Sequence, residues 1–317
     1  MKKLNIQQCA DSGSQFCPCH LAYSGDCIRC NMINGNNICD CAWQGVCVYS
    51  EVKHNKKQIT DLRKEYLCNI ENIKEIKDNT YLLSIKIPNE IAKDLLSPGA
   101  YIMLKSIDRV SDIFNAPISV MDVDIDREIL QVVIKPRGIK TKGIINFNQV
   151  YLKGPYFNGI FGIKEIKTTQ NSNCLVVVSG LSQVNSINVI RRLITNNNKV
   201  EVLINNRSSL LDEVVQKIMD LGVSIYEIDA SKDKDFIIDY IIRNEIEFVY
   251  SGASHRFSKE VMDIVDSVDK NIKLAISNNN LICCGEGVCG ACTVNINGQR
   301  VKTCKSQVDS RDYLNSL

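Results

Sequence analysis

The middle of the chain alternates apolar and polar residues at the period of two that is typical of β-strands. Two such runs flank the turn Asp78-Asn79 and predict a hairpin. Further runs, punctuated by turns such as Ser97-Pro98-Gly99, predict four more strands. The six predicted strands are residues 66–76, 80–87, 100–105, 118–123, 128–135 and 149–153. Six strands within ~90 residues, without a strong helical pattern, favour a small antiparallel β-barrel.

From Cys174 onward, short apolar runs alternate with segments whose apolar residues recur at helical spacing. The apolar runs predict buried strands at residues 175–178, 200–204, 224–228, 247–250 and 272–276. The segments between them predict helices at residues 184–196, 210–221, 236–243 and 257–268. Alternating strands and helices are typical of a doubly wound parallel sheet, so the expected class is an α+β chain of several domains.

A cysteine-rich loop follows the last of these strands. Its thiols are spaced C-x4-C-x2-C-x11-C, and they belong to Cys284, Cys289, Cys292 and Cys304. The spacing of the first three cysteines, C-x4-C-x2-C, matches the cysteine spacing of plant-type [2Fe–2S] ferredoxins. The interspersed glycines allow the positive φ angles with which backbone amides can turn toward the sulfides. A zinc site is the alternative, but zinc sites usually combine two C-x2-C-like pairs. The pattern therefore predicts a [2Fe–2S] cluster on these four cysteines.

Cys283 offers a second register for the first ligand, with a spacing of x5 instead of x4. The x4 spacing through Cys284 fits the ferredoxin pattern better. We therefore expect Cys283 to be a small buried residue without a ligand role.

Residues 1–55 form a separate block with eight of the fifteen cysteines. These are Cys9, Cys17, Cys19, Cys27, Cys30, Cys39, Cys41 and Cys47. So few apolar residues cannot make an independent core, whereas thiolate ligation of a metal contributes folding free energy directly. One or two iron–sulfur clusters, zinc, and unliganded thiols all remain open for this block.

Composition excludes several classes of protein. The 38 basic and 36 acidic residues give a net charge of +2, so the chain lacks the excess of basic residues that is typical of nucleic-acid-binding proteins. No apolar run approaches the ~20 residues of a membrane span, and the first residues lack the apolar segment of a secretory signal. Fifteen cysteines in such a chain indicate a reducing cytoplasm and metal or redox chemistry.

The succession of barrel, α/β domain and C-x4-C-x2-C-x11-C tail resembles the electron-transfer subunits of dihydroorotate dehydrogenases, within the ferredoxin-NADP reductase superfamily. The resemblance covers residues 66–317 and leaves the N-terminal cysteine block unexplained. It implies an FAD-binding barrel at 64–165, a nucleotide-type α/β domain at 170–277 and a [2Fe–2S] module at 278–317. The cysteine-rich metal or iron–sulfur module would occupy residues 1–55.

The family binds FAD through an Arg-Pro-x-Ser strand, the strand after it and a Gly-Thr turn. The resemblance assigns these roles to Ala116, Pro117, Ile118, Ser119, Val133, Ile134, Lys135, Gly138, Lys140 and Thr141. Ala116 stands where the family has an arginine that neutralises the phosphates. The resemblance therefore implies weaker FAD binding unless Lys135, Arg137 or Lys140 supplies the missing charge.

The nucleotide half departs further from the family, which has a Gly-Gly-Gly-x-Gly-x-x-Pro turn after the first strand. Here residues 179–186 keep one glycine, and we expect Leu181 and Gln183 to crowd the phosphate path. The family's Cys-Gly-Pro beside the nicotinamide is replaced by Ser251-Gly252-Ala253. We therefore expect NAD(P) binding to be weak or absent; a tolerant variant that still binds NAD(P) is the alternative.

The favoured function is an electron-transfer subunit that relays electrons between FAD, a [2Fe–2S] cluster and a partner. Flavin suits this role because it converts two-electron chemistry into single steps. The chain shows no catalytic residues of its own, so it is expected to be an oxidoreductase subunit rather than a stand-alone enzyme. The expected partner is a catalytic oxidoreductase subunit, with a ferredoxin as a further candidate.

Two other functions remain open. A complete NAD(P)H-oxidising subunit of the dihydroorotate dehydrogenase or transhydrogenase type is the first. A structural, metal-rich adaptor of a larger complex is the second.

Overall fold

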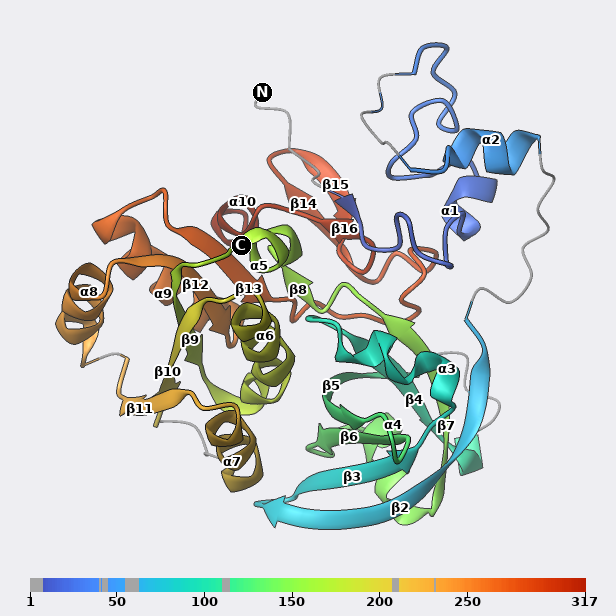
Figure 1. Ribbon diagram of the computed structural model, residues 1–317. Helices are drawn as coiled ribbons and strands as arrows, with labels where there is room; N and C mark the ends of the chain where they lie inside the picture. Colours follow the sequence, from blue (N-terminus) through green and yellow to red (C-terminus); the bar gives the residue numbers. More distant parts are fainter. Residues whose placement is uncertain are drawn as a thin grey trace.

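The computed structural model describes residues 8–39, 41, 45–54, 63–109, 115–206, 211–230 and 232–317. In this part of the chain, a β-barrel and a parallel sheet with helices on both faces lie side by side (Figure 1). The N-terminal block and the C-terminal cysteine loop lie together at the top of the same view. Segments from opposite ends of the sequence therefore meet at one place.

The barrel is closed and antiparallel, with the strand order β2-β3-β6-β5-β4-β7. Its strands are β2 (Glu65–Lys77), β3 (Thr80–Lys86), β4 (Tyr101–Ser106), β5 (Ala116–Asp124), β6 (Ile129–Ile134) and β7 (Gln149–Tyr156). Two short helices, α3 (Asn89–Ala92) and α4 (Ile139–Lys142), join them. Each of the six predicted strands is confirmed, because alternating apolar residues fill the barrel interior.

The sheet has the order β11-β10-β9-β12-β13-β8 and contains five parallel strands. These are β9 (Asn173–Val178), β10 (Lys199–Asn205), β11 (Ser224–Ile228), β12 (Ile246–Gly252) and β13 (Lys273–Ser277). The antiparallel edge strand β8 (Ile160–Phe161) completes it. The predicted doubly wound sheet is confirmed; β8 escaped prediction because two residues carry no periodicity.

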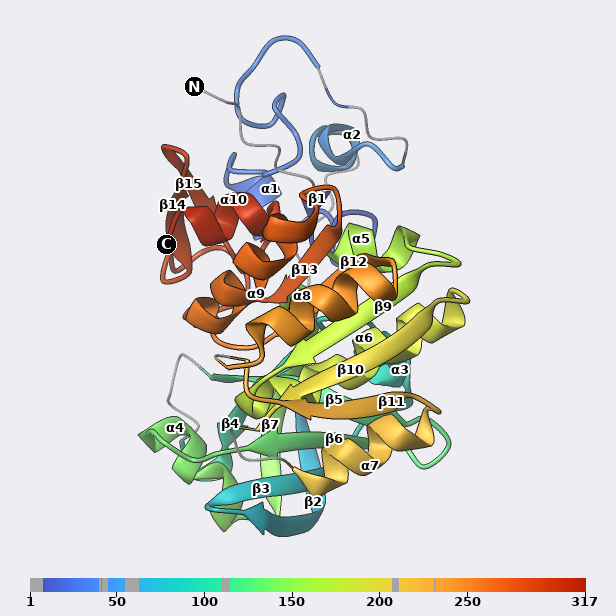
Figure 2. The same cartoon turned by 90° about the vertical axis from the view of Figure 1, so that its left-hand side faces the viewer.

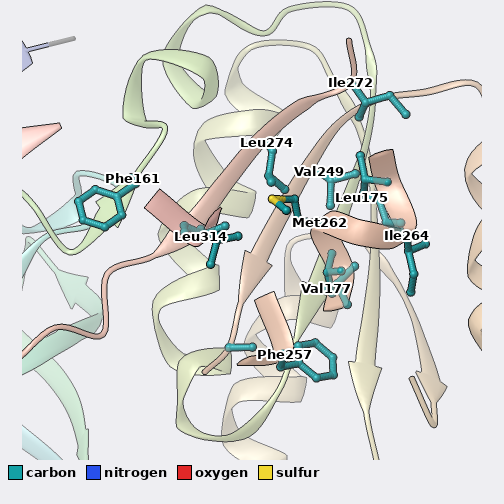
Figure 3. Close-up of a cluster of buried hydrophobic side chains, with 14 of the residues drawn as sticks. Phe161, Leu175, Val177, Val249, Phe257, Met262, Ile264, Ile272, Leu274 and Leu314 are labelled. Atoms are coloured by element: carbon teal, nitrogen blue, oxygen red, sulfur yellow. The ribbon is translucent and has the colours of Figure 1, made fainter. Parts of the chain in front are cut away.

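Helices cover both faces of this sheet. They are α5 (Ile163–Thr168), α6 (Gln183–Thr195), α7 (Asp212–Asp220), α8 (Lys234–Arg243), α9 (His255–Val268) and α10 (Ser310–Asn315). Figure 3 shows one of the two cores, where Leu175 and Val177 of β9 meet Met262 of α9 and Leu314 of α10. On the other face, α5, α6 and α7 share a core with the barrel residues Leu82, Met121 and Val133. The predicted helices are confirmed, except that residue 210 lies outside the described part.

Ion pairs also fix the barrel against the sheet. Asp122 of β5 accepts from Arg191 of α6 at 2.9 Å and from Lys217 of α7 at 2.5 Å. Burial would raise the pKa of Asp122, but these two cations outweigh it and lower the pKa. The carboxylate therefore stays charged and paired at the domain junction.

The C-terminal part adds the hairpin β14 (Thr293–Ile296) and β15 (Gln299–Lys302), followed by β16 (Ser306–Gln307). Strand β16 pairs antiparallel with β1 (Gln8–Cys9), and the Ala10 amide donates to the Lys305 carbonyl at 2.7 Å. The N-terminal block then continues into α1 (His20–Tyr23) and α2 (Val48–Lys53). Figure 2 shows α1 beside the C-terminal strands from a second direction.

Across the described segments, no helix combines the length and the apolar character that crossing a bilayer requires.

Candidate functional site

The four cysteines expected to ligate the cluster come together in two pairs after β13. Cys284 hydrogen-bonds to Cys289 through the side chains, and Cys292 likewise pairs with Cys304. The pKa of Cys304 is raised first by Cys292, then by burial, and further by the charge of Cys284. Within the described ranges, no three His, Cys, Asp or Glu side chains gather around a single ion position. A [2Fe–2S] cluster requires two thiolates on each of two irons, which is an arrangement in pairs.

The loop backbone already directs donors at these sulfurs. The Glu286 amide donates to Cys284 Sγ at 3.3 Å. Burial alone would raise the pKa of Cys284, but the backbone amides of Cys289, Glu286 and Val288 outweigh burial and lower it. The hydrogen bond from Cys304 lowers the pKa of Cys292 to about 6. Both shifts favour the thiolate, which is the form that binds iron.

Two glycines let the loop approach its neighbours closely. Gly285 has a φ of +68°, and a Cβ there would stand 2.5 Å from the ring of Tyr156 on β7. Gly287 has a φ of +75°, and a Cβ there would stand 2.8 Å from Leu21 of α1. Backbone conformation and space both exclude a side chain at these positions. The loop is therefore held between the barrel and the N-terminal block.

Cys283 is half-buried rather than buried as expected, and the pairs form through Cys284. This placement agrees with the predicted x4 register. The assignment of Cys284, Cys289, Cys292 and Cys304 as ligands stays a prediction.

A network of two cations and two anions is buried beneath the loop. Its members are Asp11, Arg63, Glu286 and Lys305, all of them buried. Arg63 donates from Nη2 to Asp11 Oδ1 at 2.5 Å and from Nη1 to Glu286 Oε2 at 3.1 Å. Lys305 donates to Glu286 Oε2 at 3.0 Å and also to Asp11. We call these four residues the ionic network.

Arg63 ties further parts of the chain to the ionic network. Its Nε donates to the Pro155 carbonyl at 2.6 Å. Its guanidinium carbon lies 4.1 Å from the ring centroid of Phe16 and 4.4 Å from that of Tyr156. Such cation–π contacts gain strength when they are desolvated. One side chain thus joins the N-terminal block, β7 and the cluster loop.

Charge balance keeps the network ionised. Burial would raise the pKa of Asp11 and of Glu286, but Lys305 and Arg63 outweigh it and hold both below their ordinary values of 3.8 and 4.5. The pKa of Lys305 is raised, because Asp11 and Glu286 outweigh the effect of burial. At neutral pH the network therefore holds two positive and two negative charges.

A cavity of about 270 Å³ opens between the barrel and the sheet, near the cluster loop. Residues from both parts line it, among them Pro117, Ser119, Leu181, Asn185, Asn279 and Ile282. Strand β5 alternates, so Pro117 and Ser119 face outward while Ala116 and Ile118 point into the barrel core. Tyr101 also lines the cavity, and its buried hydroxyl has no hydrogen-bond partner among the described residues. The lining combines apolar side chains with several hydroxyl and amide groups, which suits a flat ring system with a polar edge.

The wall between this cavity and the cysteines is thin. Tyr101 and Ile282 line the cavity, and both also pack in one apolar cluster with Cys292 and Cys304. Tyr101 stacks on Tyr156, with ring centroids 5.1 Å apart. One layer of side chains thus contacts both candidate cofactor positions.

The remaining residues assigned to FAD are not in this cavity. The side chains of Val133 and Ile134 pack in cores, and Lys135, directly after the end of β6, is half-buried. Gly138, Lys140 and Thr141 lie on a separate turn, which Thr141 closes by donating to the Gly138 carbonyl at 3.2 Å. The structure therefore groups Pro117 with Ser119 but places the expected pyrophosphate turn elsewhere on the barrel.

The segment after β9, where the family would bind the phosphates of NAD(P), differs from the expectation in one respect. Gln183 does not project into the phosphate path, because its side chain is buried, donates to the Gly180 carbonyl at 2.8 Å and accepts from the Leu211 amide at 3.0 Å. Asn205 donates to Ser179 Oγ at 3.2 Å. The Asn205–Ser179 bond crosses between the carboxyl ends of β10 and β9, the edge where nucleotides bind in such sheets. The Gln183–Leu211 bond joins the first residue of α6 to the residue before α7. The edge is thus occupied by a side-chain bridge rather than by a protruding glutamine.

The eight N-terminal cysteines separate into two sets. Four of them line one small cavity, namely Cys9, Cys17, Cys19 and Cys27. Cys30 packs beside Cys27 in a small apolar cluster, Cys41 is half-buried, and Cys39 and Cys47 are exposed. Burial raises the pKa of Cys17 to about 11, and the nearby Cys19 and Cys27 add to the shift.

Little in the sequence indicates the ionic network. Asp11 and Lys305 are 294 positions apart, so no local pattern links them. The available signal was the position of Glu286 between two predicted ligands and of Lys305 directly after a third. A charged residue inside a buried cluster loop requires a partner of opposite charge.

Comparison with known proteins agrees with this architecture. A family described as a 2Fe-2S iron-sulfur cluster binding domain matches residues 243–315. The electron transfer subunit of dihydroorotate dehydrogenase B (NAD(+)) from Clostridium acetobutylicum is 26% identical over 237 residues, which cover 74% of this chain and 90% of the relative.

Solved structures show the same fold. A structure of NADH-dependent reduced ferredoxin-NADP oxidoreductase, described in a study of flavin-based electron bifurcation, matches with a TM-score of 0.61 and 16% identity. The match covers 80% of this chain and 93% of that one. The ferredoxin reductase of carbazole 1,9a-dioxygenase matches with a TM-score of 0.51 and 10% identity, over 68% of this chain and 67% of that one.

The fold is that of the oxidoreductase and ferredoxin reductase structures named above, and residues 243–315 match a [2Fe–2S]-binding domain, which confirms the expected resemblance. Among named proteins, the chain is similar to the electron transfer subunit of dihydroorotate dehydrogenase B.

The register of the cluster is testable by substitution. Cys284→Ser should abolish the [2Fe–2S] EPR signal of the reduced protein, because the first iron would lose one of its two thiolates. Cys283→Ser is the matched control and should leave the signal nearly intact. The reverse outcome, loss in Cys283→Ser alone, would shift the register by one.

The ionic network predicts a large effect from a small change. Glu286→Gln leaves Arg63 and Lys305 facing Asp11 alone, so the free energy of unfolding should fall by about 3–5 kcal/mol at pH 7. The control Glu213→Gln, in an exposed pair with Lys74, should cost less than about 1 kcal/mol. Urea unfolding measures both.

The pH dependence has a definite sign. The pKa of Glu286 is lowered on folding, so its contribution is fully present above 4.5 and is lost as pH falls through the folded pKa. The difference between wild type and Glu286→Gln should therefore shrink in acid. A difference that is constant from pH 7 to pH 3 would contradict the ionic assignment.

Proposed function

We propose that this chain is the electron-transfer subunit of an oxidoreductase, with FAD in the cavity beside Pro117 and Ser119 and a [2Fe–2S] cluster on the paired cysteines. FAD would supply the step between two-electron and one-electron chemistry. The cluster would pass single electrons to or from a partner.

One observation carries the proposal. Tyr101 and Ile282 line the cavity and pack against Cys292 and Cys304. A flavin ring in the cavity would thus be separated from the cluster by one layer of side chains. The barrel and the cluster loop form this wall jointly, so both cofactors are held in one rigid core.

Residues of this chain have distinct roles at the flavin. Pro117 fixes the backbone of β5, and Ser119 presents its hydroxyl on the outward face of that strand. Asn278 and Asn279 also line the cavity, and their side-chain NH2 groups are fixed by hydrogen bonds to other parts of the chain. Ala116 brings no charge to the phosphates, so Lys135, Arg137 and Lys140 are the candidate cations near the pyrophosphate turn.

The partner would supply the substrate chemistry. The similar protein from Clostridium acetobutylicum is by name an electron transfer subunit of a dehydrogenase. We infer a hetero-oligomer with a catalytic oxidoreductase subunit, with a ferredoxin as a second candidate partner, in the cytoplasm. We also infer that the N-terminal block holds a further metal centre, either iron–sulfur or zinc.

Binding of FAD tests the first part of this proposal. Ser119→Ala removes one hydrogen bond to the flavin and should weaken FAD binding about fivefold to tenfold. Ser84→Ala, on strand β3 of the same barrel and outside the cavity, is the control and should leave the affinity unchanged. Quenching of flavin fluorescence gives both dissociation constants. Absence of FAD binding in wild type with an intact cluster spectrum would favour the structural adaptor.

The second prediction concerns NAD(P)H. Because Asn205 and Ser179 bridge the edge where the pyrophosphate would lie, the isolated protein should oxidise NADH and NADPH slowly. Stopped-flow mixing of flavin-loaded protein with either nucleotide should show little bleaching, while dithionite bleaches the same sample at once. Fast bleaching at micromolar nucleotide would restore the complete NAD(P)H-oxidising subunit as the function.

A further inference from the structure

Two neighbouring strands of the barrel, β4 and β7, present a pair of tyrosines outside the barrel core. Ala100 and Ile102 pack in that core, so Tyr101 between them points to the opposite side. Its cross-strand neighbour on β7 is Tyr156, and the two rings stack with centroids 5.1 Å apart and planes 17° apart. Gly285 of the cluster loop packs closely on the Tyr156 ring. The orientation of the Tyr101 ring is therefore fixed by packing.

The hydroxyl of Tyr101 is buried and has no hydrogen-bond partner among the described residues. Other atoms of Tyr101 line the flavin cavity, which has a volume of about 270 Å³. A hydroxyl that faced a cavity of this size would be reached by water, whereas this one is sealed from it. The hydroxyl therefore points away from the flavin cavity. Buried polar groups are satisfied as a rule, so its position indicates an acceptor that the chain itself does not supply.

The surroundings of Tyr101 indicate which acceptor this is. Tyr101 belongs to one apolar cluster, whose other members are Met103, Tyr156, Ile282, Cys292 and Cys304. Apart from Tyr156, these side chains carry no oxygen or nitrogen, so the remaining polar atoms of the cluster are sulfurs. Burial raises the pKa of Tyr101, and the charge of Cys304 is the next largest cause. The phenol thus keeps its proton and can donate a hydrogen bond beside two predicted iron ligands.

We propose that the Tyr101 hydroxyl donates a hydrogen bond to a sulfur of the [2Fe–2S] cluster, on the side held by Cys292 and Cys304, and thereby raises the reduction potential of the cluster. Reduction by one electron increases the negative charge on the cluster, and hydrogen bonds to charged acceptors are stronger. The donor therefore stabilises the reduced cluster more than the oxidised one. No bond is broken, and the proton stays on the Tyr101 oxygen.

This inference rests on the proposed function and deepens it, because it names a residue that sets the potential of the cluster against that of the flavin. One side chain would contact both cofactors, with part of it in the wall of the flavin cavity and its hydroxyl directed at the cluster. A higher potential at the cluster favours the movement of single electrons from the flavin toward the cluster.

The test is a redox titration of the full-length protein with its cofactors, followed by EPR. Tyr101→Phe removes the hydroxyl and keeps the ring, and because that hydroxyl has no partner in the described chain, the variant should fold. The equilibrium constant for reduction of the [2Fe–2S] cluster should fall about tenfold, which for one electron is a shift of about 59 mV to lower potential. The matched control Tyr151→Phe, on β7 but outside both the apolar cluster and the cavity, should leave the potential unchanged.

Electron–nuclear double resonance of the reduced cluster, in H2O and in D2O, gives a second readout. Wild type should show one exchangeable proton near the cluster that Tyr101→Phe lacks. Equal cluster potentials in wild type and Tyr101→Phe would overturn the inference and leave the proposed function standing. Weaker FAD binding in Tyr101→Phe, with an unchanged cluster potential, would also overturn it, because the hydroxyl would then serve the flavin. Absence of a [2Fe–2S] signal from wild type would contradict the proposed function together with the inference.

Discussion

The rest of the structure depends on the ionic network of Asp11, Arg63, Glu286 and Lys305. Four charges are buried at one point, and each has a partner of opposite sign at hydrogen-bond distance. A buried pair of this kind adds little net stability over an apolar replacement, but loss of one member is costly. The network therefore penalises any arrangement that separates the N-terminal block, β7 and the cluster loop, because each separation would leave a buried charge without its partner.

That arrangement decides where the redox groups can be. The network and the two close-packed glycines seat the cluster loop against Tyr156, whose ring stacks on Tyr101 at the flavin cavity. On its other side the same loop packs against Leu21 of the N-terminal block. The flavin cavity and the [2Fe–2S] cysteines thus lie next to each other, on the two sides of one apolar cluster. In the proposed function, the parallel sheet supports this arrangement and contributes little nucleotide binding.

Regular structure was predictable because it is encoded locally. Period-two runs such as 80–87 fill a barrel interior, and apolar runs such as 175–178 form central parallel strands buried on both faces. The pairing of Cys284 with Cys289 also follows from spacing within one loop. The fold class was therefore accessible from the sequence alone.

What escaped prediction involves contacts between distant residues. Strand β1 exists because β16 pairs with it, not because of its own two residues. The sequence predicts that Gln183 crowds the phosphate path. In the structure its side chain is buried and accepts from the Leu211 amide, a contact between distant residues that no local pattern reveals. The division of the N-terminal cysteines into a cavity-lining set and a remainder likewise depends on where the C-terminal module holds Cys9.

The central claim is that a [2Fe–2S] cluster and a flavin lie on opposite sides of the side-chain layer that contains Tyr101 and Ile282. Anomalous X-ray scattering at the iron absorption edge, from crystals grown without oxygen and with FAD, tests it most directly. The expected result is an iron peak among Cys284, Cys289, Cys292 and Cys304, with the flavin ring beside Pro117 and Ser119. An iron peak away from these four cysteines, or a flavin bound away from this cavity, would contradict it.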